Sequence, residues 1–247
     1  MRILEALAAG NGGGGSAAIS QRLGISQSTC YRTLQTFEAA DWIRKTGDGG
    51  YALSFGLLPI ARALQGVDHV VALLRAPMER LVEATRLSVK LSVRQGHDQV
   101  TLARVESPSP LGVTSPVGAR FPVVVGASGS SLLSVLPAAD LDAIVAHADR
   151  ARLWGHDDGA ALRRRIAACL RDGVCDYLGI HPQGIDTVSA PLSASSGHFA
   201  LTLVGLRGDF AGARGAQARQ ALLKVAGYLS DSESGLVYLS LNSRLRR

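Results

Sequence analysis

Apolar residues recur at helical spacing in two stretches near the start of the chain. Ile19 and Leu23 share one side of a short first helix, and Gly24 is suited to end it because glycine readily takes the left-handed conformation that closes helices. A second helix is predicted by an apolar stripe at positions i, i+4 and i+7, formed by Cys30, Leu34 and Phe37. Two short helices joined in this way are the pattern of a helix-turn-helix.

The other side of the second predicted helix is polar. Ser26 is suited to cap its first turn, because a serine hydroxyl accepts from an otherwise unpaired backbone N–H. In a helix-turn-helix the start of the second helix points into the major groove of DNA, where such side chains bond base edges or phosphates. The candidate DNA-binding residues on this helix are Gln27, Ser28, Thr29, Tyr31, Arg32 and Gln35.

A short β-hairpin is predicted directly after this helix. Residues 42–45 and 51–53 are β-type runs, and the glycine-containing segment 46–50 connects them. A hairpin in this place is a wing, and Arg44 and Lys45 at its base can approach phosphates without reading the base sequence. The alternative is an ordinary corner of two helices with a solvated polar face. Because helix pair and hairpin occur together, we favour a winged helix-turn-helix that binds DNA.

Helical spacing also predicts three helices around this motif. One covers residues 2–9, one covers residues 55–64, and a long helix begins near Asp68 and contains Pro77, which suggests a kink or a break. We therefore expect a DNA-binding domain at residues 1–54, a linker helix at 55–67 and a second domain at 68–247.

The second domain mixes strands and helices. Alternating runs predict a hairpin of residues 88–94 and 99–106, and further strands at 111–114, 121–125, 174–178, 187–192 and 199–206. Helices are predicted from Gly126 to Leu136, before Pro137, and at 138–148, 159–172 and 215–241. Strands interrupted by helices, with hairpins at both ends, indicate an α+β domain around a largely antiparallel sheet.

Composition and charge narrow the class of protein only a little. The 247 residues are 47% apolar and 19% charged, as in ordinary globular proteins, and the net charge of +6 is compatible with a nucleic-acid partner. No apolar run reaches the roughly 18 residues of a membrane span, and the first ten residues are too short for a signal peptide. The three cysteines, Cys30, Cys169 and Cys175, are an odd number and show no metal-ligand spacing, so we expect a reducing cytoplasm. For Cys175 the alternatives are a redox sensor and a buried strand cysteine, and we favour the buried cysteine.

The order of these motifs resembles the IclR-type bacterial transcriptional regulators over nearly the full chain. The resemblance rests on ILEALA, GISQSTCYRTLQTFEAADWIRK and GGYALSFGLLPIA, and on the segments 102–108, 117–122 and 189–192. It implies a winged helix-turn-helix, a linker helix and a GAF-like domain that binds a small-molecule effector, assembled as homodimers or dimers of dimers. The family's acidic run is largely missing at 173–182, and Thr187 stands where the family often has cysteine, so the family's ligand is not carried over.

The turn at residues 126–131 is the candidate start of the effector site. It lies between an apolar strand and a helix start, where backbone N–H groups can face an anion such as a carboxylate. The alternative is a tight connection whose serines only cap the helix. With the resemblance we favour a pocket for a small organic or aromatic acid, lined by Leu111, Val113, Gly126, Ala127, Ser128, Asp176, Thr187, Ser189 and Thr202.

An enzyme is the rival class. Ser128, Asp176 and His181 or His198 supply a nucleophile, an acid and a base, but Ser130 stands where a nucleophile elbow requires glycine. The histidines fall in no metal-ligand spacing, so we expect neither metal nor cofactor. The sequence thus predicts an effector-modulated DNA-binding regulator, with repression slightly favoured over activation. The alternative is a small-molecule-binding or hydrolytic domain with no regulatory role on DNA.

Overall fold

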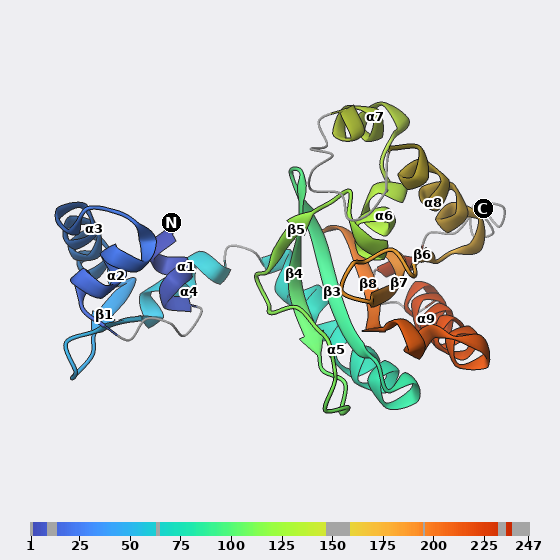
Figure 1. Cartoon of the computed structure of the whole chain (residues 1–247), viewed down its shortest axis with the longest axis horizontal. Helices are drawn as coiled ribbons and strands as arrows, with labels where there is room; N and C mark the ends of the chain where they lie inside the picture. Colours follow the sequence, from blue (N-terminus) through green and yellow to red (C-terminus); the bar gives the residue numbers. More distant parts are fainter. Residues whose placement is uncertain are drawn as a thin grey trace. The chain divides into compact units, whose positions relative to one another are not determined.

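The computed structural model describes residues 2–8, 14–62, 65–146, 159–194, 196–231 and 236–238 (Figure 1). The chain divides into two compact units, Met1–Gln65 and Gly66–Arg247. The predicted linker segment at 55–67 is not one helix. A 3-10 turn, η1 (Phe55–Leu57), and the short α4 (Leu58–Arg62) follow the hairpin, and α5 (Gln65–Thr85) begins before the expected Asp68.

The first unit is the predicted helix-turn-helix with its hairpin. It contains α1 (Arg2–Ala8), α2 (Ser16–Leu23), α3 (Gln27–Ala39), β1 (Ile43–Lys45) and β2 (Tyr51–Leu53). Gly24 ends α2 at φ +61°, and the Ser26 hydroxyl accepts from the Thr29 N–H at 3.1 Å. The strands pair antiparallel. The buried core consists of Ile3, Leu7, Ile19, Cys30, Leu34, Ile43 and Tyr51.

The second unit is built on an antiparallel sheet in the order β5-β4-β3-β8-β7-β6 (Figure 1). Strand β9 also pairs with β7. The strands are β3 (Ser88–Gln95), β4 (Asp98–Val105), β5 (Arg120–Pro122), β6 (Cys175–Tyr177), β7 (Ile185–Ala194), β8 (Gly197–Leu206) and β9 (Leu236–Tyr238). In addition to α5, the described helices of this unit are α6 (Gly126–Ser134), α7 (Ala138–Ala146), α8 (Gly159–Asp172) and α9 (Gly212–Asp231). No described helix is both long and apolar enough to cross a membrane.

The two faces of this sheet carry different side chains. Val89 and Leu91 of β3 pack with α5 and α9 in the largest apolar cluster. Because side chains alternate along a strand, Lys90 and its neighbours at 88 and 92 point to the opposite face, which α6 covers. The cluster on that side includes Leu132, Leu162 and Ile166 from α6 and α8. A helix-covered polar row on the sheet is the setting for the candidate site.

Helix α6 lies close to the chain that precedes it. Gly126 starts it at φ +80°, a backbone conformation that favours glycine. A Cβ atom at Gly129 would collide with the carbonyl oxygen of Val123. The small residues at this turn therefore set how closely α6 approaches residues 123–125.

Three predicted elements differ from the structure. Residues 111–114 form no strand, since Gly112 N–H bonds the carbonyl of Ser109 in a local turn. The strand predicted at 121–125 ends at Pro122, which lacks an N–H for the sheet, and Val125 N–H turns back to the Pro122 carbonyl at 3.1 Å. The last helix is described as far as Asp231, and residues 236–238, predicted as part of it, instead pair with β7 as β9; residues 232–235 and 239–241 of the predicted range lie outside the described part.

The cysteines in the second unit are paired. A disulfide joins Cys169 of α8 to Cys175 of β6, while Cys30 is a free, buried thiol in the first unit. The burial expected for Cys175 is confirmed, at 1% exposure, whereas its pairing with Cys169 was not predicted.

A candidate DNA-binding face and a pocket in the second unit

The exposed side of α3 carries all six helix residues predicted to bind DNA. Cys30 and Leu34 turn inward and are fully buried, which fixes the orientation of the helix. Gln35 donates to the Tyr31 hydroxyl at 3.1 Å, and Tyr31 is 48% exposed. The outward residues are Gln27, Ser28, Thr29, Tyr31, Arg32 and Gln35. The helix thus presents a row of donors and acceptors to solvent.

The hairpin adds two exposed cations next to this helix. Arg44 and Lys45 are both exposed on β1, and the Lys45 ammonium lies 3.4 Å from the carboxylate of Glu38 on α3. Phe37 and Trp42 stack with ring centroids 5.6 Å apart, where α3 meets β1. Helix and hairpin are therefore held together as one surface with side chains suited to base edges and phosphates.

The second unit contains a partly open pocket of about 280 Å³, which we call the α6 pocket. Its walls come from β3, β4, β5, the start of α6, β6, β7, β8 and the loops at 113–116 and 181–183. The lining residues are Lys90, Gln99, Val113, Thr114, Ser115, Pro116, Phe121, Val125, Gly126, Ser128, Tyr177, His181, Gln183, Ile185, Thr187 and Val204. A volume near the lower end of the range for ligand sites, about 300–1,000 Å³, suits a small molecule.

Polar side chains at the start of α6 bond one another. Gln99, only 3% exposed, donates to the Val125 carbonyl at 2.8 Å and accepts from the Ser128 hydroxyl at 2.5 Å. The Ala127 N–H donates to the Thr187 hydroxyl at 3.2 Å. One backbone N–H of the predicted anion-binding turn is therefore already used inside the protein.

The predicted effector residues fall into two groups. Val113, Gly126, Ser128 and Thr187 line the α6 pocket. Leu111 is 75% exposed and lines a separate cleft of about 420 Å³ that also takes in Val113. The remaining four, which do not line the α6 pocket, are Ala127, Asp176, Ser189 and Thr202.

Three of these four are held away from the pocket by their contacts. Ala127 is fully buried against the disulfide and Tyr177. The hydroxyls of Ser189 and Thr202 are buried and lie 2.9 Å apart, and Ser189 also donates to the Leu201 carbonyl. The hydrogen-bonding needs of these two hydroxyls are therefore met within the sheet.

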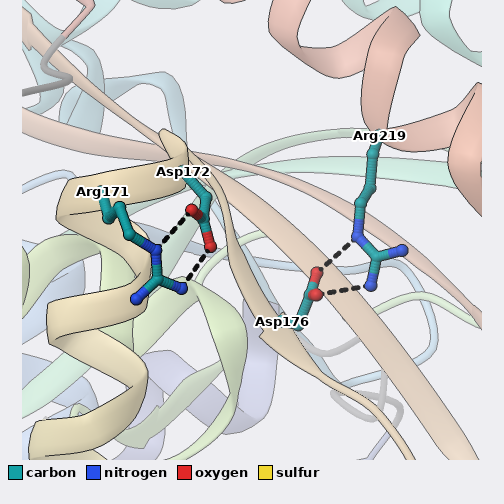
Figure 2. A network of polar contacts seen from close by, with 4 residues as sticks. All are labelled: Arg171, Asp172, Asp176 and Arg219. Carbon is teal, nitrogen blue, oxygen red and sulfur yellow. Dashed lines mark hydrogen bonds and ion pairs between the residues drawn. The ribbon is translucent and has the colours of Figure 1, made fainter. Parts of the chain in front are cut away.

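Asp176 belongs to a different cavity. It forms a bidentate ion pair with Arg219 of α9, with one N–O distance of 3.0 Å, beside the Arg171–Asp172 pair at the end of α8 (Figure 2). This cavity, of about 380 Å³, is lined by Arg165, Ala168, Asp172, Val174, Asp176, Arg219 and Leu223. Strand alternation explains the separation, since the neighbouring Tyr177 lines the α6 pocket.

The groups named for a hydrolase are only partly brought together. Ser128 and His181 both line the α6 pocket, but the Ser128 hydroxyl donates to Gln99 and His181 Nδ1 accepts from the Gln183 N–H at 3.1 Å. Burial lowers the pKa of His181, although Asp186 opposes this effect. Asp176 is bound to Arg219, and His198 Nδ1 lies 2.6 Å from the Ser193 hydroxyl. Within the described residues, no group of acids, histidines or cysteines could hold a metal ion.

Sequence reasoning missed the charged residue of the α6 pocket. Lys90 is 8% exposed on β3, and its ammonium lies 5.3 Å from the centre of the Phe121 ring. Burial lowers its pKa from 10.5 to about 8. The sequence shows a lysine between the apolar Val89 and Leu91, but only the structure shows that α-helices cover both faces of this strand. Gln99, Phe121, Tyr177 and His181 were also missed as lining residues.

The chain thus combines a winged helix-turn-helix with an α+β domain that contains a small pocket. Residues 1–47 match the IclR helix-turn-helix domain, and residues 62–231 match the C-terminal domain of the bacterial transcriptional regulator IclR. The chain belongs to the IclR family.

Individual relatives agree with this family. The chain is 33% identical over 147 residues to the probable transcriptional regulator SauR of Cupriavidus necator, covering 59% of the chain and 58% of SauR. It is 29% identical over 145 residues to the transcriptional repressor AllR of Klebsiella pneumoniae, covering 58% of the chain and 53% of AllR. The chain thus spans little more than half the length of these relatives.

A solved structure shows the same fold. The IclR homolog from Microbacterium hydrocarbonoxydans, complexed with 4-hydroxybenzoate, superposes with a TM-score of 0.71 at 21% identity. The likeness covers 88% of the chain and 92% of that structure.

Proposed function

We propose that the protein is a sequence-specific DNA-binding transcriptional regulator whose binding to an operator is modulated by a small organic or aromatic acid in the α6 pocket. The observation that carries the DNA part is the exposed polar face of α3 beside the hairpin, within a domain of the IclR helix-turn-helix family. Repression is slightly favoured, as in the relative AllR. Whether the regulator represses or activates transcription depends on where the operator lies relative to the promoter.

The proposed DNA contacts divide into two kinds. Gln27, Ser28, Thr29, Tyr31, Arg32 and Gln35 are proposed to reach bases and nearby phosphates from α3. Arg44 and Lys45 are proposed to contact phosphates from the hairpin, because exposed cations beside a recognition helix position the protein on the duplex. Residues 1–65 hold six basic and four acidic side chains, so their net charge is modest and specific contacts must contribute beside the general field.

The proposed effector site is the α6 pocket. From the predicted set it includes Val113, Gly126, Ser128 and Thr187, and the lining adds mostly apolar walls and one cation. The neighbouring structure that holds 4-hydroxybenzoate supports an acid of this size as the kind of ligand. The remaining predicted residues act, in this proposal, through packing around the pocket: Leu111, Ala127, Asp176, Ser189 and Thr202.

Regulation requires that the acid binds two arrangements of the protein with different affinity, because a ligand with equal affinity shifts no equilibrium. We propose a homodimer or a dimer of dimers as the working assembly, as the family resemblance implies. The cytoplasm, where operator DNA is found, is the proposed compartment. The Cys169–Cys175 disulfide does not support this compartment, since disulfides are uncommon in reducing surroundings.

Duplex binding by the full chain tests the DNA proposal. Operators are first selected from a random duplex library, and affinity is then measured by fluorescence anisotropy over a salt series. We expect Arg32→Ala to weaken binding to the selected duplex by about 1–3 kcal/mol and to relax the preference at one base position. The observed binding constant of the parent chain should fall linearly with salt on logarithmic axes.

Arg94→Ala is the matched control. Arg94 is an exposed arginine of the second unit that donates to the Gly96 carbonyl at 2.9 Å, so its loss should leave duplex affinity unchanged. An Arg32→Ala protein with unaltered base preference would remove Arg32 from the reading face. Absence of any selected sequence, together with turnover of an ester or amide by the chain, would instead favour the hydrolase alternative.

A further inference from the structure

Lys90 is a buried cation that faces no anion within the described part of the chain. Its side chain lines the α6 pocket, and the residue is 8% exposed. No ion pair or hydrogen bond of Lys90 occurs among the described residues, and its one specific contact is the face of Phe121. Its cross-strand neighbour on β4 is another cation, Arg104, which binds Glu106 at 2.7 Å.

A buried ammonium without a counter-ion is unfavourable, because removing a charge from water costs more than a single ring face returns. Burial is the cause of the lowered pKa, which stays at about 8, so the side chain is mostly charged at neutral pH. A methionine or leucine would fill the same space without this cost. The charge is therefore best explained by a ligand that meets it.

The rest of the pocket is consistent with an anion at Lys90 and not at the start of α6. There the Ala127 N–H, the Gln99 amide and the Ser128 hydroxyl already have partners within the protein. By contrast, the buried Thr114 hydroxyl in the pocket wall makes no hydrogen bond. The pocket thus holds an uncompensated cation, and an unused hydroxyl is buried in its wall.

The remaining walls are mainly apolar. They include Val113, Phe121, Val125, Ile185 and Val204, and none of the described lining residues is an aspartate or a glutamate. A volume of about 280 Å³ leaves room for a short aliphatic chain or a single ring beside the charged group. The complementary ligand is therefore a small acid with one anionic end and one apolar end.

We propose that Lys90 selects a carboxylate ligand, with its ammonium pairing with the carboxylate in the α6 pocket while the apolar walls hold the rest of the molecule. This inference rests on the proposed effector function and specifies the residue that recognises the acid. Neutral molecules of the same shape bind poorly, because they leave the ammonium unpaired. Lys90 is thereby a specificity-determining residue.

Matched acid and amide probes test this inference in the full chain at pH 7. Acetate, butyrate, phenylacetate and benzoate are each compared with the corresponding amide by calorimetry and by the shift in melting temperature. We expect at least one acid to bind about tenfold or more tightly than its amide, the size of effect usual for a hydrogen bond to a charged group. Lys90→Met and Lys90→Gln should both abolish this preference.

Lys224→Met is the matched control, since Lys224 is one of only three lysines and is exposed on α9. It should keep the acid preference of the parent chain. The inference is contradicted if no acid binds the parent more tightly than its amide, or if either Lys90 variant keeps the preference. Duplex binding without probe separates this failure from failure of the proposed function. Lys90→Met should still bind the duplex. If neither the parent chain nor any variant binds the duplex, the proposed regulatory function fails, while the acid preference is judged on its own.

Discussion

At the scale of single residues, the buried charge of Lys90 lowers the stability of the fold but is proposed to bind the acid. Burial lowers its pKa from 10.5 to about 8, so between these values the unfolded chain binds more protons than the folded one. The free energy of unfolding of the parent chain should therefore rise with pH from about 8 toward 10, relative to that of Lys90→Met. At pH 7 the variant should be the more stable by roughly 1–3 kcal/mol.

Chemical denaturation of both proteins across this pH range measures the difference, and groups common to both cancel. Lys224→Met again serves as the comparison, because an exposed lysine should give no such pH dependence. A Lys90→Met protein less stable than the parent at pH 7 would mean that Lys90 has a structural partner.

Residue-level predictions succeeded where burial follows a simple period. The stripe of Cys30 and Leu34 correctly placed the outward residues of α3. In the second unit, neighbouring polar residues point to opposite faces, so Asp176 meets Arg219 while Tyr177 lines the pocket. Ser189 and Thr202 bond each other across β7 and β8, a pairing that depends on strand register. Sequence alone does not give that register.

At the scale of elements, the packing of α6 depends on Gly129. Because a Cβ atom there would collide with the Val123 carbonyl oxygen, Gly129→Ala should shift the helix and lower the melting temperature of the second unit, at a cost of about 1–3 kcal/mol. Gly208→Ala is the control, since an added Cβ there meets no atom within 4 Å. Calorimetry compares the two. Equal melting temperatures for the Gly129 variant and the parent would show that α6 does not approach residue 123 so closely.

Most helices and strands could be predicted because the hydrophobic periodicity of each ends where a glycine, a proline or a turn residue also marks an end. Helix α8 matches its predicted range of 159–172, and the hairpin of β3 and β4 lies where alternation placed it. The errors occur where a long-range partner decides the structure. Residues 236–238 pair with β7 although helical spacing continues through them, and Val123–Val125 form a buried turn from a run as apolar as a strand.

At the scale of the whole molecule, the chain combines a helix-turn-helix unit with an α+β unit that contains the α6 pocket, and each was recognisable by a different kind of signal. The first unit followed from local spacing, whereas the α6 pocket is assembled from segments between residues 90 and 204. Tertiary packing places Lys90 in the pocket and buries its charge. Sequence spacing does not show this packing, and it pointed to the α6 turn instead. The central claim is that an acid in the second unit changes how the first unit binds DNA.

The most direct test is an anisotropy titration of the selected duplex with the full chain, with and without a saturating acid from the probe set. We predict that the acid changes the duplex dissociation constant by about fivefold or more, the usual size of a coupling between two sites. The same acid should have no effect on Lys90→Met. Superimposable curves for the parent chain with and without the acid, or equal affinity for the selected and a scrambled duplex, would contradict the account.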